Sequence, residues 1–107
     1  MEKIVGVMNS VARAMSAANE TMKSNKKPQL TIRDLQTLVV AAQDGHSGPR
    51  KLASLRGVSS AAMTGSIDAL EKKGLITRQN APHDRRVTPI RLTALGDKVI
   101  AAASDAI

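Results

Sequence analysis

Residues 57–75 read Gly-Val-Ser-Ser-Ala-Ala-Met-Thr-Gly-Ser-Ile-Asp-Ala-Leu-Glu-Lys-Lys-Gly-Leu, and they contain the strongest indication of the fold. Ser59 is a typical N-cap and Gly74 a typical C-terminal stop, so this stretch predicts a helix that ends at Lys73. Met63, Ile67 and Leu70 recur at helical spacing. We therefore expect these three side chains to face a core.

A shorter helix is predicted immediately before this one. It begins at Pro49 or Arg50, carries Leu52 and Leu55, and stops at Gly57. Two helices joined by the three-residue turn 57–59 are typical of a helix-turn-helix motif.

The hydrophobic period changes after Gly74. Residues 75–80 and 87–92 predict two short strands around the polar loop 81–86, with Ile90 and Leu92 on one face. Pro89 cannot donate to a strand ladder, so the second strand is expected to be an edge there. Thr93 then caps a last helix, which bears Leu95, Val99, Ile100 and Ala103.

Two helices are predicted upstream. Thr31 and Asp34 have the spacing of a capping box and begin one of them, with a turn at 45–49 after it. Residues 2–23 form the other, with a seam in a 4-3-4-3-4 rhythm: Ile4, Met8, Val11, Met15, Ala18 and Met22. This seam can cover the chain's own core or pair with a second subunit, and we favour the dimer interface.

The order helix, helix-turn-helix, hairpin, helix predicts a winged helix-turn-helix, which is a mainly α fold with a small β-hairpin wing (α+β). We expect one domain over residues 1–107, with an N-terminal dimerisation helix (2–23), a winged-helix core (30–92) and a C-terminal helix (93–107).

Charge and composition limit the classes of function that this chain can have. The net charge is +7, of which +6 falls within residues 50–91, and a basic segment of this kind favours a duplex DNA partner. The chain has no Cys and no aromatic residue, and its only histidines are His46 and His83, so we expect no metal and no cofactor. No nucleophile–base motif or glycine-rich phosphate loop is present, so we expect no enzyme activity. No membrane-span-length apolar run or signal peptide is seen, which predicts a cytoplasmic protein.

Several motifs together resemble the multiple-antibiotic-resistance-regulator (MarR) family. They are Leu-Glu-Lys-Lys-Gly-Leu-Ile at 70–76, Pro-His-Asp-Arg-Arg at 82–86 and Leu-Thr-Ala-Leu-Gly at 92–96, supported by Leu52-Ala53, Val58-Ser59 and Leu30-Thr31. The resemblance covers residues 30–96. It implies a DNA-binding regulator in which Asp84 braces the wing and Arg86 contacts the minor groove.

The helix 59–73 is expected to enter the major groove, and phosphate contacts should come from its N-terminus and from nearby cations. The DNA-binding residues are thus expected to be Arg50, Lys51, Arg56, Ser59, Ser60, Ala61, Thr64, Gly65, Asp68, Lys72, Arg78, Arg85 and Arg86. This face has no Arg, Asn or Gln for bidentate base contacts. Gly65 either lets the helix sit deep in the groove or is simply tolerated, and both interpretations remain open.

The hypothesis is a homodimeric repressor on a palindromic operator. One alternative is a DNA-coating, segregation or architectural protein, and a second is an antirepressor-like interaction module that does not bind DNA. MarR-like proteins often bind small aromatic or phenolic effectors, but the effector pocket has no motif to align here. Family members usually continue further after the helix that Thr93 caps, which leaves residues 2–23 as the expected dimer interface.

Overall fold

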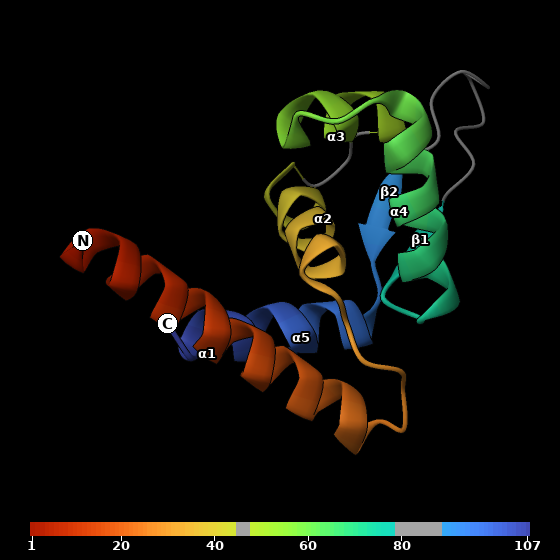
Figure 1. Cartoon of the computed structure of the whole chain (residues 1–107). Coiled ribbons are helices and arrows are strands. Elements are labelled where there is room, and N and C mark those ends of the chain that lie inside the picture. The colour runs from red at the N-terminus through yellow and green to blue at the C-terminus, as the bar shows by residue number, and fades with distance from the viewer. Residues whose placement is uncertain (45–47, 79–88) are drawn as a thin grey trace.

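The computed structural model describes residues 1–44, 48–78 and 89–107. The elements follow in the order α1 (Glu2–Ser24), α2 (Ile32–Asp44), α3 (Pro49–Arg56), α4 (Ser60–Lys72), β1 (Ile76–Arg78), β2 (Ile90–Leu92) and α5 (Ala94–Asp105). This is the predicted winged helix-turn-helix order (Figure 1). Among the described residues no helix combines the length and apolar character needed to cross a membrane.

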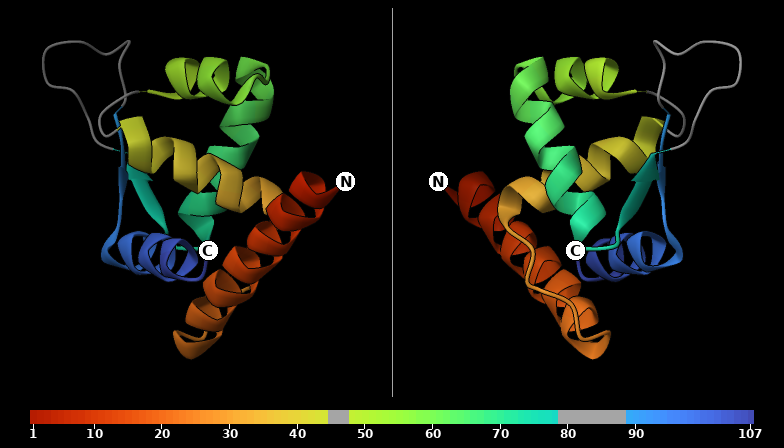
Figure 2. Two further views of the ribbon diagram at one scale, coloured as in Figure 1. Left: turned by 90° about the vertical axis from the view of Figure 1, so that its left-hand side faces the viewer. Right: turned by 90° about the vertical axis from the view of Figure 1, so that its right-hand side faces the viewer.

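The molecule has two layers. The long helix α1 packs along α5 at the base, and α2 rises from this base to contact α3, α4 and β2 (Figures 1 and 2). The core runs through both layers, because Met22, Leu38 and Val99 are all fully buried in one cluster. Helix α2 therefore joins the helix-turn-helix to the base.

The helix boundaries agree with the predicted caps. Thr31 Oγ1 accepts the Asp34 N–H at 3.1 Å and the Asp34 carboxylate accepts the Thr31 N–H at 2.9 Å, which confirms the capping box. Ser59 Oγ accepts the Ala62 N–H at 3.1 Å, and Gly57 ends α3 in the left-handed region with φ 72°. A residue without a Cβ adopts that conformation at no steric cost.

The hairpin is antiparallel, with Ile76 opposite Leu92 and Arg78 opposite Ile90. Its first strand begins at Ile76, one residue later than predicted, and the Leu75 carbonyl before it accepts the Thr93 N–H at 2.9 Å. Ile90 is buried and Arg91 exposed, as the alternation predicted. The predicted loop and the outer strand ends, residues 79–88, lie outside the described residues.

The predicted dimer seam on α1 is divided in two. Ala18 and Met22 are completely buried in the chain's own core, because α5 lies against the C-terminal half of α1. These two residues therefore cannot contact a second subunit, contrary to the expectation. Met15 is half-buried against the same core, whereas Ile4 and Met8 are 64% and 59% exposed.

Candidate nucleic-acid interface

Helix α4 has one buried and one exposed face. Met63, Ile67 and Leu70 are fully buried, as predicted, and this fixes which side chains point outward. Of the expected base-reading residues, Ala61, Thr64, Gly65 and Lys72 are exposed and Asp68 is half-buried. A Cβ built on Gly65 meets nothing within 4 Å, and the neighbouring exposed side chains of Ala61 and Thr64 are also small.

The N-terminal end of α4 is suited to phosphate. Ser59 and Ser60 are both exposed, and the Ser59 cap leaves further backbone N–H groups of the first turn facing outward. The helix dipole adds a partial positive charge at this end. Arg50 and Lys51, at the start of α3, are also exposed.

Arg78 on β1 is committed to two carboxylates of α4. Its Nη2 donates to Asp68 Oδ1 in a short contact, and its Nη1 donates to Glu71 Oε1 at 2.9 Å. Asp68 and Arg78 were expected to contact DNA separately, and Glu71 was not among the expected site residues. The structure joins the three into a cluster that ties the hairpin to α4, and its two carboxylates outnumber its one guanidinium, so this site carries no net positive charge.

Arg56 at the end of α3 is turned inward. Its Nη1 donates to Thr37 Oγ1 at 2.8 Å and to Ser66 Oγ at 2.9 Å, on α2 and α4 respectively. Arg56 was expected to contact phosphate, and these two hydrogen bonds within the chain were not predicted. The sequence contained no pattern that pairs these residues, because they are brought together only by helix packing.

A part-buried ion pair lies at the C-terminal end of α4. Lys73 Nζ donates to Asp34 Oδ2 at 2.6 Å and to the Gln29 carbonyl at 2.9 Å. Burial raises the pKa of the Asp34 carboxyl, but the hydrogen bonds from Lys73 and the Thr31 N–H, with the Lys73 charge, outweigh burial and hold this pKa below 3.8. The pair fixes the C-terminal end of α4 to the start of α2.

The remaining expected site residues are Asp84, Arg85 and Arg86, with His83 beside them, and all lie outside the described residues. The structure therefore places eleven of the thirteen expected DNA-binding residues. Among these, Arg56 and Arg78 donate hydrogen bonds to side chains of other elements.

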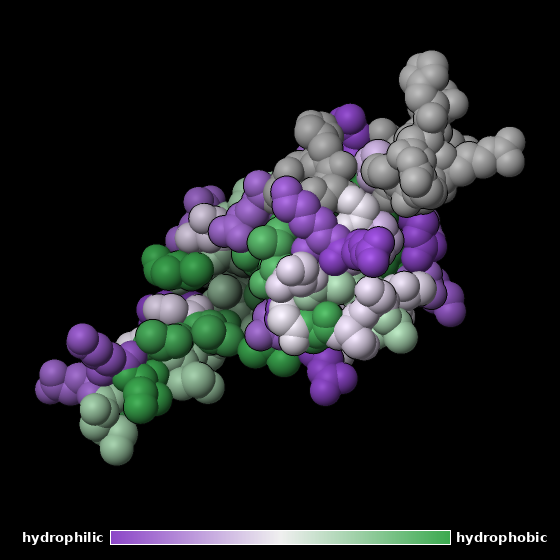
Figure 3. Space-filling view, turned by 90° about the horizontal axis from the view of Figure 1, so that it is seen from above, coloured by the Kyte–Doolittle hydropathy of each residue, from purple (hydrophilic) through white to green (hydrophobic). Residues whose placement is uncertain are grey.

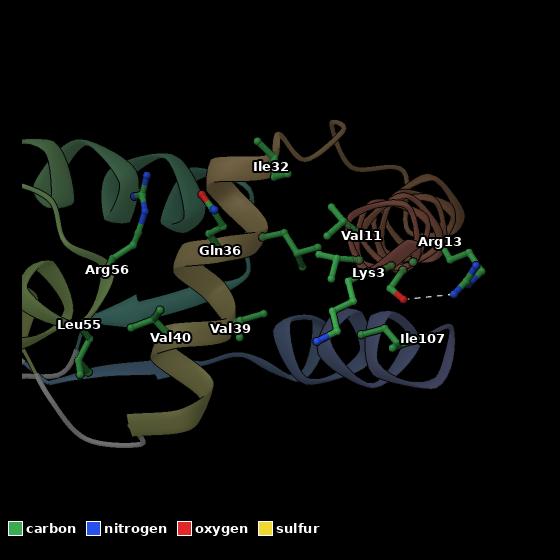
Figure 4. A pocket seen from close by; sticks show the side chains of 15 residues that line it. Lys3, Val11, Arg13, Ile32, Gln36, Val39, Val40, Leu55, Arg56 and Ile107 are labelled. Carbon is green, nitrogen blue, oxygen red and sulfur yellow. Dashed lines mark hydrogen bonds between the residues drawn. The ribbon is translucent and has the colours of Figure 1, made fainter. Parts of the chain in front are cut away.

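A second surface lies away from α4. The N-terminal half of α1 projects beyond the body, and hydrophobic side chains gather over it (Figure 3). Val7 is 61% exposed and Ile107 72% exposed. Between α1 and α2 is an open cavity of about 1000 Å³, which side chains of α1, α2, α3 and the C-terminus surround (Figure 4). Its walls include Val11, Val39 and Leu55, with the cations Lys3 and Arg13.

The two-layer helical body, the helix-turn-helix and the hairpin define a winged-helix protein of the DNA-binding regulator class. The MarR family matches residues 30–88, which is more than half of the chain. The chain belongs to the MarR family.

Solved structures agree with this assignment. The chain is similar to RV1404 from Mycobacterium tuberculosis, with 25% identity, a TM-score of 0.79 and coverage of 97% of this chain and 68% of that one. It resembles CouR from Rhodococcus jostii RHA1, solved with p-coumaroyl-CoA, at 28% identity and TM-score 0.63, covering 97% and 71%. A mutant of E. coli MarR complexed with operator DNA has the same fold, at 20% identity and TM-score 0.68, covering 98% and 71%.

Proposed function

We propose that this chain is a transcriptional repressor that binds a palindromic operator as a homodimer. The observation that carries the proposal is the exposed, Ser59-capped face of α4, held on a helix-turn-helix whose other side is buried. A helix supported in this way can enter the major groove while its N-terminus meets phosphate. Occupation of the operator would then block transcription.

The homodimer is supported by the N-terminal half of α1. Ile4, Val7 and Met8 are each more than half exposed on a projecting helix. A contiguous apolar surface of this kind is unusual on a monomer, and a second copy with two-fold symmetry can cover it. The two α4 helices would then lie roughly 34–36 Å apart, about one turn of DNA.

We assign the wing to the minor groove on the basis of its sequence. Arg85 and Arg86 would enter a narrow A·T-rich groove, and Asp84 would orient one guanidinium. The described part of the hairpin supports this role, because Arg78 of β1 binds Asp68 and Glu71 and so attaches the hairpin to α4.

The experiment is selection from a random-sequence duplex pool, followed by footprinting and light scattering. One protected palindrome bound by two chains is the expected result. Long cooperative protection would instead support a DNA-coating or architectural protein. Failure to retain any duplex, even at low salt, would contradict DNA binding and leave the protein-interaction alternative.

A second candidate function is effector binding in the cavity between α1 and α2. Its apolar walls and the cations Lys3 and Arg13 suit an aromatic carboxylate. CouR was solved with p-coumaroyl-CoA bound. Calorimetric titration with p-coumarate and with p-coumaroyl-CoA tests this role: saturable heat that Val39→Asp abolishes would support it, and no heat from either compound would count against it.

A further inference from the structure

Arg56 connects three helices through one nitrogen atom. It is the last residue of α3, and its Nη1 reaches Thr37 Oγ1 on α2 at 2.8 Å and Ser66 Oγ on α4 at 2.9 Å. Hydrogen bonds from a charged donor are shorter and stronger than neutral ones. The guanidinium therefore constrains the distance and the angle between α2 and α4.

The acceptor on α2 is itself rigid. Thr37 is 1% exposed, and its hydroxyl donates to the Arg33 carbonyl at 2.9 Å. With its hydrogen used in this way, the hydroxyl oxygen presents lone pairs toward Arg56. Helix α2 is also the element that joins the base to the helix-turn-helix. By binding Thr37 on α2, Arg56 therefore fixes α4 relative to the base of the molecule.

The acceptor on α4 lies at the border of the exposed face. Ser66 follows Gly65 and precedes the fully buried Ile67. The apolar side chains of this part of α4, such as Met63, make non-directional contacts with the core, and Asp68 binds Arg78 of β1. A directional bond at Ser66 therefore fixes the rotation of α4 about its axis more sharply than the apolar contacts do.

We infer that Arg56 is a positioning residue that sets the rotation of α4, and with it the base preference of the protein, and that it is not a phosphate contact. The inference rests on the proposed DNA-binding function. Helix rotation decides which of Ala61, Thr64 and Asp68 meet base edges, whereas a phosphate contact contributes equally to every sequence.

The test compares the full chain with the variants Arg56→Gln, Ser66→Ala and Thr37→Val. Each is titrated against the duplex that the wild type selects and against an unrelated duplex of equal length, over a range of salt concentrations. We expect each variant to lose about tenfold of its preference for the selected duplex, as expected for one hydrogen bond to a charged group. The salt dependence should stay that of the wild type, and Arg56→Gln combined with Ser66→Ala should lose no more than either alone.

Two matched substitutions on α3 complete the design. Arg50→Gln removes an exposed arginine from the same helix, and it should weaken binding to both duplexes while reducing the salt slope by about 0.9 per phosphate lost. Ser54→Ala removes an exposed hydroxyl from that helix and should leave binding as in the wild type. Circular dichroism of each variant at the titration temperature establishes that it is folded.

Three results would overturn the inference while wild-type binding is intact. One is a reduced salt slope for Arg56→Gln together with a wild-type response of Ser66→Ala, which is the behaviour of a phosphate contact. Another is additive loss in the double variant. The last is a lowered melting temperature with unchanged preference, which is a purely structural role. Absence of binding by the wild type, seen before any variant is made, would instead refute the proposed function.

Discussion

Two glycines inside helices have opposite surroundings. A Cβ on Gly96 would lie 2.3 Å from the Leu75 carbonyl oxygen, whereas a Cβ on Gly65 meets nothing within 4 Å. The Leu75 carbonyl also accepts the Thr93 N–H, so it cannot withdraw without breaking the connection between β2 and α5. Only glycine permits this close approach.

We therefore expect Gly96→Ala to lower the free energy of unfolding by about 1–3 kcal/mol, as overpacking does. Gly65→Ala is the matched control, and it should raise this free energy by up to about 1 kcal/mol because alanine favours the helix. Thermal or urea unfolding measures both. Equal effects of the two substitutions would contradict the close contact at Gly96.

Asp34 makes the free energy of unfolding depend on pH in the acidic range. Hydrogen bonds and charge hold its pKa below 3.8, the value for a free side chain, so the ionised form stabilises the fold. This contribution is complete above the unfolded-state pKa and disappears as the pH falls through the lower folded-state pKa. It is therefore lost below about pH 4.

Asp34→Asn should lower stability at neutral pH by about 1 kcal/mol or more, because it removes the ion pair with Lys73 and weakens the cap. The difference from the wild type should shrink as the pH is lowered toward about 2. Urea unfolding across this range measures it, with Glu20→Gln on the exposed side of α1 as control. A difference that stays constant with pH would show that the carboxylate charge is not the cause.

At the scale of elements, α1 is one continuous helix with two surroundings. Its C-terminal half packs on α5, and its N-terminal half leaves Ile4 and Met8 exposed. A single apolar repeat therefore serves intramolecular packing over part of its length and is free for a second chain over the rest.

Met8→Glu is expected to shift the protein from dimer to monomer, because it places a charge in the proposed interface. Asn9→Glu adds the same charge to an exposed neighbouring position on a different side of α1, and it should leave the dimer intact. Light scattering at several concentrations distinguishes the two states. A Met8→Glu protein that remains dimeric would place the interface elsewhere.

The ion pairs between Arg78 of β1 and α4 predict how the salt dependence of DNA binding responds to substitution. The guanidinium of Arg78 is held by Asp68 and Glu71, so it has little charge left to offer a phosphate. Arg78→Gln should therefore leave the salt slope of duplex binding nearly unchanged. Lys72→Gln, which removes an exposed cation from α4, should reduce that slope by about 0.9. A similar reduction from both variants would show that Arg78 leaves its partners on binding.

At the scale of the molecule, polar contacts help to join the base to the segment that leads toward the helix-turn-helix. Asn19 of α1 makes such contacts, since its Oδ1 accepts the Leu30 N–H at 2.6 Å and its Nδ2 donates to the Leu30 carbonyl at 3.3 Å. These bonds orient the segment that leads from α1 into α2. The position of the whole reading unit relative to the base depends on this segment and on the packing of α2.

Asn19→Ala should lower the free energy of unfolding by about 1–3 kcal/mol, because it leaves both backbone groups of Leu30 without these partners. Asn19→Asp retains the acceptor for the Leu30 N–H, so it should recover part of the loss. Urea unfolding of the two variants compares them. A loss that Asn19→Asp does not reduce at all would argue against the hydrogen bond as its origin.

The sequence by itself determined the elements and their order. Caps such as Ser59 and Thr31, stops such as Gly57, and the period of Met63, Ile67 and Leu70 are local signals, because they act between residues a few positions apart. These signals predicted the helices to within a residue or two. Separately, the positive charge of residues 50–91 indicated a DNA partner.

Only the tertiary structure decided which expected site residues are free to act. Arg56 and Thr37 are 19 positions apart, Lys73 and Asp34 are 39 apart, and no local pattern pairs them. The sequence also could not show which part of the α1 seam is buried. The apolar spacing is uniform along the helix, but α5 covers only one end of it. A hydrophobic period shows that one face of a helix is apolar. Which element covers that face depends on how the whole chain packs.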